Sequence, residues 1–374
     1  MKKKILVMLV FILTAFLFTQ VKNPDTPLKG KWDFKMEKTW EVEEAGDDVI
    51  GSVQNIDSAD DGRVYILDSK NYKIYIFSPE GKFISSFGRK GEGPGEIKNF
   101  NSGEQLFVAD QHIIVVDRSR ISYFSLDGAF EKSIVYSPQM KPREFVSAEA
   151  LVSAPVSPES LGGKAAKIKW YNVNDKSEKT IAEYELFKKA AATDRSPGRT
   201  VTVVAVFSGI TPIMIVKYRD NRVYYGMCDT YTINRVDLKD KKTSSFSIEG
   251  REPLEITPAI KKELAKGLGD IPQDLLEKIM DGLPKKASFY QDLVIDNRGF
   301  IYVFLANPTA KPIQGIDIFS PDGKYLYSSQ LRFEEGSTIQ AIYLRDNLLV
   351  IAVEDEEGTV KVVQYSVQLP GPMA

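Results

Sequence analysis

A glycine-rich stretch at residues 88–96, GRKGEGPGE, has the composition of a loop that could hold a phosphate. Such loops need backbone N–H groups that converge at a helix N-terminus, as in G-x-x-x-x-G-K-[ST] or G-x-G-x-x-G. Here Gly91, Gly93 and Gly95 are two residues apart, and the EIKNF that follows does not start a helix. Pro94 also removes one N–H group. The spacing argues against a nucleotide site and favours a connection between strands.

Few residues could act as nucleophiles or metal ligands. The single cysteine, Cys228, excludes an intramolecular disulfide, and the single histidine, His112, excludes a metal centre built from histidines alone. Asp68 and Asp117 each end a strand-like segment, a recurrence that could indicate calcium. The alternative is that Asp68 caps the turn containing Asn71. We expect no catalytic residues and no resident cofactor, with calcium left open.

Internal repetition indicates which elements position these residues. The segment IFSPEGKFISS (76–86) returns as IFSPDGKYLYSS (318–329) and, more weakly, as YFSLDGAFEKS (123–133). Each copy is typical of a strand, a turn with Asp or Gly, and a second strand. Another hairpin precedes each copy, for example DDGRVYILD (60–68). Each unit is therefore predicted to contain four antiparallel strands in about 45 residues.

The unit recurs six times when the weaker copies are included, which predicts an all-β fold, a six-bladed β-propeller of four-stranded antiparallel blades. The last unit ends after its third strand. The alternating segment KMEKTWEVEE (35–44) is predicted to supply the missing outer strand and close the ring, so that no edge is left unpaired. An open or irregular β-sheet protein is the alternative. Strand boundaries within 145–218 are not predicted.

One helical insertion is predicted at about 257–284. Thr257 and Pro258 have the pattern of an N-cap followed by proline at the first helical position, and Pro272 separates two short amphipathic helices. We expect the pair to pack against its own scaffold. A lid over the mouth of the propeller and a partner-docking element are the alternatives.

The N-terminal segment has the pattern of an export signal. Lys2, Lys3 and Lys4 precede an apolar run, 5–18, that would form about 21 Å of helix, which is short for a membrane span. We expect 1–20 to be a signal peptide or membrane anchor, 21–34 a linker, and 35–370 a single propeller domain. The expected location is the periplasm, cell envelope or extracellular space. The near balance of 49 basic and 51 acidic residues argues against a nucleic-acid partner.

Residues 62–97 resemble an NHL repeat. The matching positions are Asp68, Asn71, Ile74, Phe77, Gly81, Phe83, Phe87, Gly88, Gly91, Gly93 and Gly95, whereas Ile97 replaces the usual aromatic residue. The wider pattern is similar to bacterial exported six-bladed β-propeller proteins of NHL-like type, and this resemblance implies a fold more than a function. Related rings that act as lactonases or lyases hold a central metal. A metal-dependent, calcium-type hydrolase or lyase is therefore the alternative function.

Loops between blades, and loops between the second and third strands, lie on one face of a propeller, which is its usual ligand face. We expect an exported binding or scaffold protein that presents a protein or small-molecule site there, without chemistry of its own. The predicted ligand-binding residues are Arg89, Lys90, Glu92, Arg118, Arg120, Asp229 and Tyr231. With the acidic run 354–357, they would suit a zwitterionic or acidic ligand. Solvated surface charge and an envelope module that docks through the helical pair are the alternatives.

Overall fold

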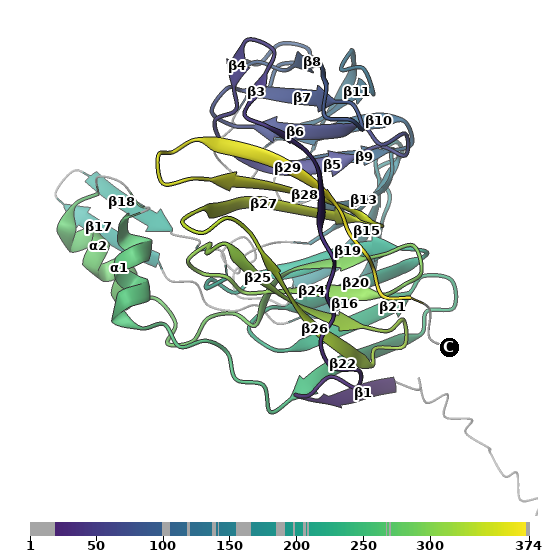
Figure 1. Ribbon diagram of the computed structural model, residues 1–374. Helices are drawn as coiled ribbons and strands as arrows, with labels where there is room; N and C mark the ends of the chain where they lie inside the picture. The colour runs from purple at the N-terminus through teal and green to yellow at the C-terminus, as the bar shows by residue number, and fades with distance from the viewer. Residues whose placement is uncertain are drawn as a thin grey trace, which may run out of the picture.

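The fold is a six-bladed β-propeller, as the repeats predicted (Figure 1). The computed structural model describes residues 19–371 apart from 99–104, 118–119, 137–139, 141, 155–165, 185–190, 197–198, 205–206, 208, 267 and 269–270. Most inner strands of neighbouring blades contact each other, so the inner strands surround a central channel. Among the described residues, no helix is both long enough and apolar enough to span a bilayer.

Blades 1 to 3 each follow the chain from the innermost strand to the outermost. Blade 1 comprises β5 (Val53–Ser58), β6 (Val64–Asp68), β7 (Lys73–Phe77) and β8 (Phe83–Phe87). Blade 2 comprises β9 (Gln105–Ala109), β10 (His112–Val116), β11 (Arg120–Ser125) and β12 (Phe130–Val135). Blade 3 comprises β13 (Pro142–Ser147), β14 (Ala150–Ser153), β15 (Ala166–Asn172) and β16 (Glu178–Tyr184).

Blades 4 to 6 each involve the N-terminal segment as well. Blade 4 comprises β19 (Met214–Arg219), β20 (Arg222–Met227), β21 (Thr232–Asp237) and β22 (Thr243–Glu249). Blade 5 comprises β23 (Tyr290–Ile295), β24 (Ile301–Leu305), β25 (Ile313–Phe319) and β26 (Tyr325–Arg332). Blade 6 comprises β27 (Thr338–Arg345), β28 (Leu348–Glu354) and β29 (Val360–Ser366).

An N-terminal strand closes the ring, which confirms the prediction for 35–44. Strand β2 (Glu37–Val42) pairs antiparallel with β29 and becomes the outermost strand of blade 6. A short hairpin, β3 (Glu44–Ala45) with β4 (Asp48–Val49), then leads into blade 1. Blade 6 therefore joins the two ends of the described chain, and β2 pairs the edge that β29 would otherwise leave open.

The repeated Ser-x-x-Gly turn explains why a glycine recurs in the outer hairpins. In blade 1 the N–H of Gly81 donates to the carbonyl of Ser78. Gly81 has a φ of +79°, a backbone conformation that is strained for residues other than glycine. A Cβ there would also lie 2.5 Å from the ring of Trp40, which comes from blade 6. The turn thus needs glycine for its backbone and for blade-to-blade packing.

A segment ahead of β2 runs along the outer edges of blades 4 and 5. Strand β1 (Thr19–Pro24) pairs parallel with β22 as a fifth strand of blade 4. Within 21–34, expected as a linker, the N–H groups of Leu28 and Trp32 donate to carbonyls of β26. The side chain of Asn23 donates to the carbonyls of Ser247 and Gly323. Figure 1 shows this segment against the sheets.

Two insertions pack together beside the ring. Helices α1 (Pro258–Lys266) and α2 (Gln273–Asp281) form the predicted pair, and α2 contacts strand β17 (Ala191–Ser196). Strand β17 pairs with β18 (Arg199–Val204), so the connection between blades 3 and 4 contains a hairpin. Figure 1 shows the four elements together at one side of the blades. One apolar cluster of this unit centres on Leu275 and Ile279. A second cluster packs Ile260 and Leu264 of α1 against Ile210 and Ala287, in the segments that lead into blades 4 and 5, so the helices also contact the scaffold.

Candidate functional site: the central channel

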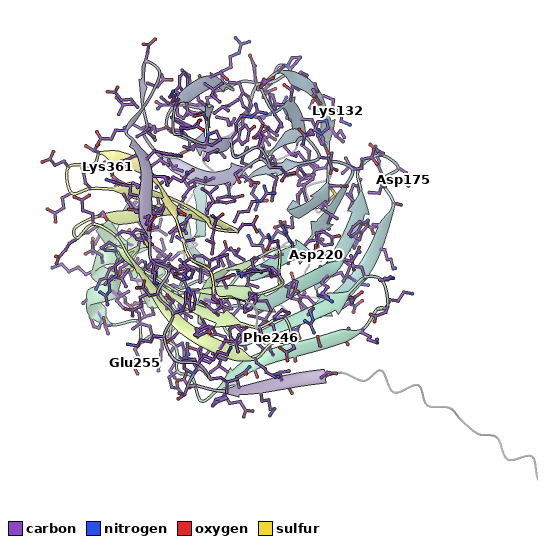
Figure 2. All side chains as sticks on the ribbon, turned by 45° about the vertical axis from the view of Figure 1, so that its right-hand side comes forward. Lys132, Asp175, Asp220, Phe246, Glu255 and Lys361 are labelled. Atoms are coloured by element: carbon purple, nitrogen blue, oxygen red, sulfur yellow. The ribbon has the colours of Figure 1, made fainter. Side chains whose placement is uncertain are left out.

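A cavity of about 300 Å³ lies in the central channel and is lined by residues from all six inner strands. Its lining includes Arg219 at the end of β19 and Asp346 in the turn after β27. In an antiparallel blade these turns lie at the end opposite to the connections between blades. Figure 2 shows Asp220, next to Arg219, nearer the middle of the ring than Lys132 on the outermost strand β12.

Equivalent irregularities in three inner strands place polar side chains in this cavity. The pairing of β5, β13 and β23 with the next strand shifts by one residue near the start of each strand. The residues directly after these shifts are Asn55, Glu144 and Asp292, and all three line the cavity. β-Bulges commonly redirect side chains near functional sites. The bulges therefore place two carboxylates and one amide on the wall of the same cavity.

Lys217 lies among these acidic groups. Its ammonium nitrogen is 3.1 Å from a carboxylate oxygen of Asp292. Burial alone would lower the pKa of Lys217, but the charges of Asp292, Glu144 and Asp57 together raise it. Lys217 is therefore an ammonium ion at neutral pH, and it offsets part of the negative charge of the channel.

Of the acidic groups that raise the pKa of Lys217, Glu144 has the fewest hydrogen bonds and ion pairs within the described residues. Burial raises its pKa to about 7, against a smaller opposing effect of the Lys217 charge. Within the described residues its carboxylate forms no hydrogen bond and no ion pair. The Oδ1 atom of Asn55 is likewise buried without a hydrogen-bond partner, as is Nε of Arg219. A buried polar atom without a partner is costly unless something else satisfies it.

On another side of the channel, Asp57 and its neighbours are hydrogen-bonded or ion-paired with other protein groups. The carboxylate of Asp57 accepts hydrogen bonds from the N–H groups of Ser58 (2.7 Å) and Val108 (2.8 Å). Burial raises its pKa despite these hydrogen bonds. The guanidinium of Arg345 donates to the carbonyl of Ser58 and pairs with Asp60. These groups hold blades 6, 1 and 2 together.

The first interblade loop connects β8 of blade 1 to β9 of blade 2. Its predicted ligand residues interact with other residues of the same loop or with blade 1. Arg89 forms an ion pair with Glu96 at 2.7 Å, and Glu92 forms one with Lys98 at 2.7 Å. Lys90 lies over the ring of Tyr72, with its nitrogen 5.1 Å from the ring centroid.

The loop is closed by its own backbone and by a residue of blade 2. Arg120 donates to the carbonyls of Glu92 (2.9 Å) and Glu96 (3.0 Å), and the N–H of Ile97 donates to the carbonyl of Arg89. The structure thus brings Arg120 together with the first loop. The prediction that the glycine cluster connects two blades is confirmed, because the loop follows β8 and precedes β9.

The other predicted residues lie elsewhere. Arg118 is outside the described residues. Asp229 is in the turn between β20 and β21, and burial raises its pKa. Tyr231, in the same turn, is buried and donates to Asp317 of blade 5 at 2.5 Å. Among the described residues, no hydrogen bond, ion pair or aromatic contact joins Asp229 or Tyr231 to the first interblade loop.

Tyr231 belongs to a set of groups between blades 4 and 5, here named the interblade cluster. It consists of the buried residues Tyr231, Asp317 and Tyr325, the partly buried Arg251 and the exposed Asp25. Asp317 accepts hydrogen bonds from Tyr231, from Tyr325 (2.6 Å) and from Arg251 (2.8 Å). Arg251 also pairs with Asp25 of the N-terminal segment. Burial raises the pKa of both tyrosines, and the charge of Asp317 raises it further. This cluster ties the N-terminal segment to two blades.

The remaining candidates for chemistry have structural partners. Asp68 is buried and accepts hydrogen bonds from the N–H groups of Lys70 (2.9 Å) and Asn71 (3.1 Å), which confirms it as a turn cap. His112 lies 3.1 Å from Glu131. Burial raises the pKa of Cys228, whose thiol donates to Ser288. In the described part of the chain, no three His, Cys, Asp or Glu side chains lie close enough to share a metal ion.

The channel residues were not among those predicted from the sequence, although a signal was present. Lys217, Asp292 and Glu144 each lie in an otherwise strand-like segment that becomes the innermost strand of its blade. A charged residue inside an apolar inner strand is expected to face the channel, because the other side of that strand packs between blades. The one-residue bulges hid this pattern, since they interrupt the alternation of apolar and polar residues.

Comparisons with known proteins agree with the fold. A family model described as a six-bladed β-propeller, DUF5128, matches residues 43–140, which include blades 1 and 2. A DUF4221-family protein from Bacteroides vulgatus is similar over 91% of this chain and 99% of its own, at 11% identity and a TM-score of 0.53. No curated protein matches the chain.

Two further solved structures have lower TM-scores. A Bacteroides fragilis protein described as exported aligns over 94% of this chain and 100% of its own, at 13% identity and a TM-score of 0.48. Virginiamycin B lyase from Staphylococcus aureus aligns over 90% and 100%, at 11% identity and a TM-score of 0.44. At such low identity, the structural likeness supports the fold alone.

Proposed function

We propose that this chain is an exported binding protein of NHL-like propeller type that holds a small zwitterionic ligand in its central channel. The apolar N-terminal run motivates export, and residues 62–97 motivate the NHL comparison. The central channel is proposed as the ligand site instead of the predicted loops, because fewer of its polar groups are hydrogen-bonded or ion-paired within the described residues. A cavity of about 300 Å³ is at the lower end of sizes for small-molecule sites.

The observation that carries the proposal is the set of unpaired polar groups on the cavity wall. The Glu144 carboxylate and the Asn55 carbonyl oxygen can both accept hydrogen bonds from an ammonium group. The Arg219 guanidinium can donate to a carboxylate, because its Nε is buried without a hydrogen bond and its ion pair with Asp220 is long, at 3.9 Å. A ligand that has both an ammonium and a carboxylate group would satisfy all three.

The same groups support binding without a covalent step. Lys217 is held as an ammonium ion, so it lacks the free electron pair that an amine nucleophile requires. Asp57 is occupied by two backbone N–H groups. Glu144 has no neighbouring hydroxyl or thiol with which it shares a hydrogen bond in the described residues. The roles that remain for these side chains are recognition and orientation of a charged ligand.

The test is calorimetric titration of the purified protein with free α-amino acids and with dipeptides. We expect at least one of these probes to bind at neutral pH, and we expect Glu144→Gln to weaken that binding about tenfold, since it removes a charge-assisted contact. The matched control is Glu183→Gln, which changes an exposed carboxylate on the outermost strand of blade 3. Absence of binding by every probe, or equal affinity of both variants, would contradict the proposal.

The metal-dependent hydrolase or lyase remains a separate prediction. The structure supplies no observation that favours it, and its test is independent of the first. Elemental analysis of the purified protein for calcium and zinc, followed by assays on lactones, would support it if metal and turnover were both found and both were lost after chelation. Turnover would also contradict the proposed role in binding alone.

A further inference from the structure

A groove of about 400 Å³ lies between the outer part of blade 3 and the turns at one end of blade 4. Blade 3 contributes Trp170 from β15 and Ile181 from β16, and blade 4 contributes Val236 and Leu238. None of these residues lines the central channel. The groove is therefore a separate site from the one proposed above.

The wall of this groove is mainly apolar. Trp170 is half-buried, and its ring packs edge-on against Tyr218, with the ring centroids 6.1 Å apart. Ile181 and Leu238 pack against the core between blades 3 and 4 and remain partly exposed in the groove. Such a wall can bind a hydrocarbon chain or an aromatic ring, because contact removes apolar surface from water.

Two lysines at the groove have no partner in the part of the chain that the structure describes. Lys179 and Lys241 are exposed and line the groove, and within the described residues neither forms a hydrogen bond or an ion pair. Three lysines in the same two hairpins do form ion pairs, which are Lys167 with Glu183 (3.0 Å), Lys169 with Glu178 (2.6 Å) and Lys242 with Asp240 (2.8 Å). Lys176 and Lys239, in the same hairpins, also form no ion pair within the described residues, but they lie outside the groove lining. What distinguishes Lys179 and Lys241 is their position on the apolar wall of the groove.

One acidic residue also lines the groove, but its carboxylate is occupied. Asp237 lies 3.4 Å from the guanidinium of Arg222 and accepts a hydrogen bond from the N–H of Lys239 at 2.9 Å. Its charge is thus largely compensated by blade 4 itself. The charges left for a ligand are the two positive ones.

We propose that this groove binds an amphiphilic carboxylate, a molecule with an apolar chain or ring and one anionic head group. The apolar part lies against Trp170, Ile181 and Leu238, and the head group lies between Lys179 and Lys241. The pairing of an apolar wall with two uncompensated cations distinguishes this ligand class from neutral lipids, which need no cation, and from inorganic anions, which need no apolar wall.

Octanoate, at concentrations where it is monomeric, is the probe that tests this site by calorimetric titration. We expect octanoate to bind, and we expect the double variant Lys179→Gln and Lys241→Gln to bind it at least tenfold more weakly. The control is the double variant Lys176→Gln and Lys239→Gln, which removes the same charge from the same two hairpins outside the groove lining. It is expected to bind octanoate like the unmodified protein.

Octanamide and inorganic phosphate test the two halves of the site separately. Octanamide keeps the chain and lacks the charge, and phosphate has the charge without the chain; each is expected to bind at least tenfold more weakly than octanoate. The proposal is overturned if octanoate does not bind, if both double variants bind it equally, or if octanamide binds as tightly. Failure of amino-acid binding in the channel would leave this result unaffected, because the two sites share no lining residue.

Discussion

The central channel and the interblade cluster contain the same kinds of side chain and differ in how completely these are paired. In the interblade cluster, the buried carboxylate of Asp317 accepts hydrogen bonds from two tyrosines and an arginine. In the channel, Asp292 has Lys217 within 3.1 Å, but within the described residues neither the Glu144 carboxylate nor the Oδ1 atom of Asn55 accepts a hydrogen bond. Burial raises the pKa of groups in both places, so a shifted pKa does not separate them.

The difference between the two regions lies in what each group can still bind. A cluster whose donors and acceptors are matched to one another stabilises the fold and leaves few of them for a ligand. This holds for the interblade cluster even though Asp25, Arg251, Asp317 and Tyr325 line a cavity of about 700 Å³. A cluster with unmatched acceptors pays a desolvation cost that a ligand can relieve. Tyr231 shows why this distinction matters, since the sequence placed it among the ligand residues and the structure places it in the matched cluster.

The largest effect is expected from removing the charge of Asp317. The variant Asp317→Asn removes the buried counter-charge of the mostly buried Arg251 guanidinium and leaves it only its ion pair with the exposed Asp25, which should lower the free energy of unfolding by about 3–5 kcal/mol. Urea denaturation followed by circular dichroism measures this loss. Asp240→Asn, which breaks the exposed pair with Lys242, is the control and should cost less than about 1 kcal/mol. Similar losses in the two variants would show that the interblade cluster is not a stabilising unit.

A smaller effect of opposite sign is expected at Glu144. Its pKa rises on folding from 4.5 to about 7, so the folded protein binds the proton more tightly and loses stability as the pH rises between these values. Above pH 7 this loss amounts to at most about 3 kcal/mol. The variant Glu144→Gln cannot lose a proton, so it should be more stable than the unmodified protein at pH 8 and closest to it at pH 4.5.

Thermal unfolding across this pH range measures the Glu144 effect. Glu183→Gln, at an exposed ion pair, serves as the control and should follow the pH dependence of the unmodified protein. A Glu144→Gln variant that is less stable at pH 8 would mean that the carboxylate contributes to the fold. The channel would then resemble the interblade cluster, and the proposed ligand site would lose its main support.

The sequence predicted the fold because the repeat depends on local chemistry. The turn at Gly81 requires glycine for its positive φ, and equivalent turns recur in other blades, so the pattern survives divergence elsewhere. The closing strand β2 was predictable because the last unit lacked an outer strand. These features are fixed by residues near one another in sequence, or by a simple count of strands.

The sites were not predictable in the same way, because they depend on contacts between neighbouring blades whose residues are far apart in sequence. Glu144 and Lys217 are separated by a whole blade in sequence and meet only in the closed ring. Tyr231 reaches Asp317 of the next blade, and Arg120 reaches back to the loop of the preceding one. No local pattern states whether such a side chain meets a partner in the protein or remains available to a ligand.

The smallest loss of stability is expected in the first interblade loop, a third region in which paired and exposed side chains can be compared. The side chain of Arg89 is 78% exposed and pairs with Glu96, so Arg89→Ala should change the free energy of unfolding by less than about 1 kcal/mol. Arg120→Ala should cost more, about 1–3 kcal/mol, because the mostly buried Arg120 guanidinium holds carbonyls of this loop. Urea denaturation of the two variants compares them directly. Equal losses of stability would mean that the ion pair of Arg89 with Glu96 holds the loop as strongly as Arg120 does. The expected larger loss for Arg120→Ala would show that Arg120 is a structural group, whereas the exposed Arg89 stays accessible to a ligand.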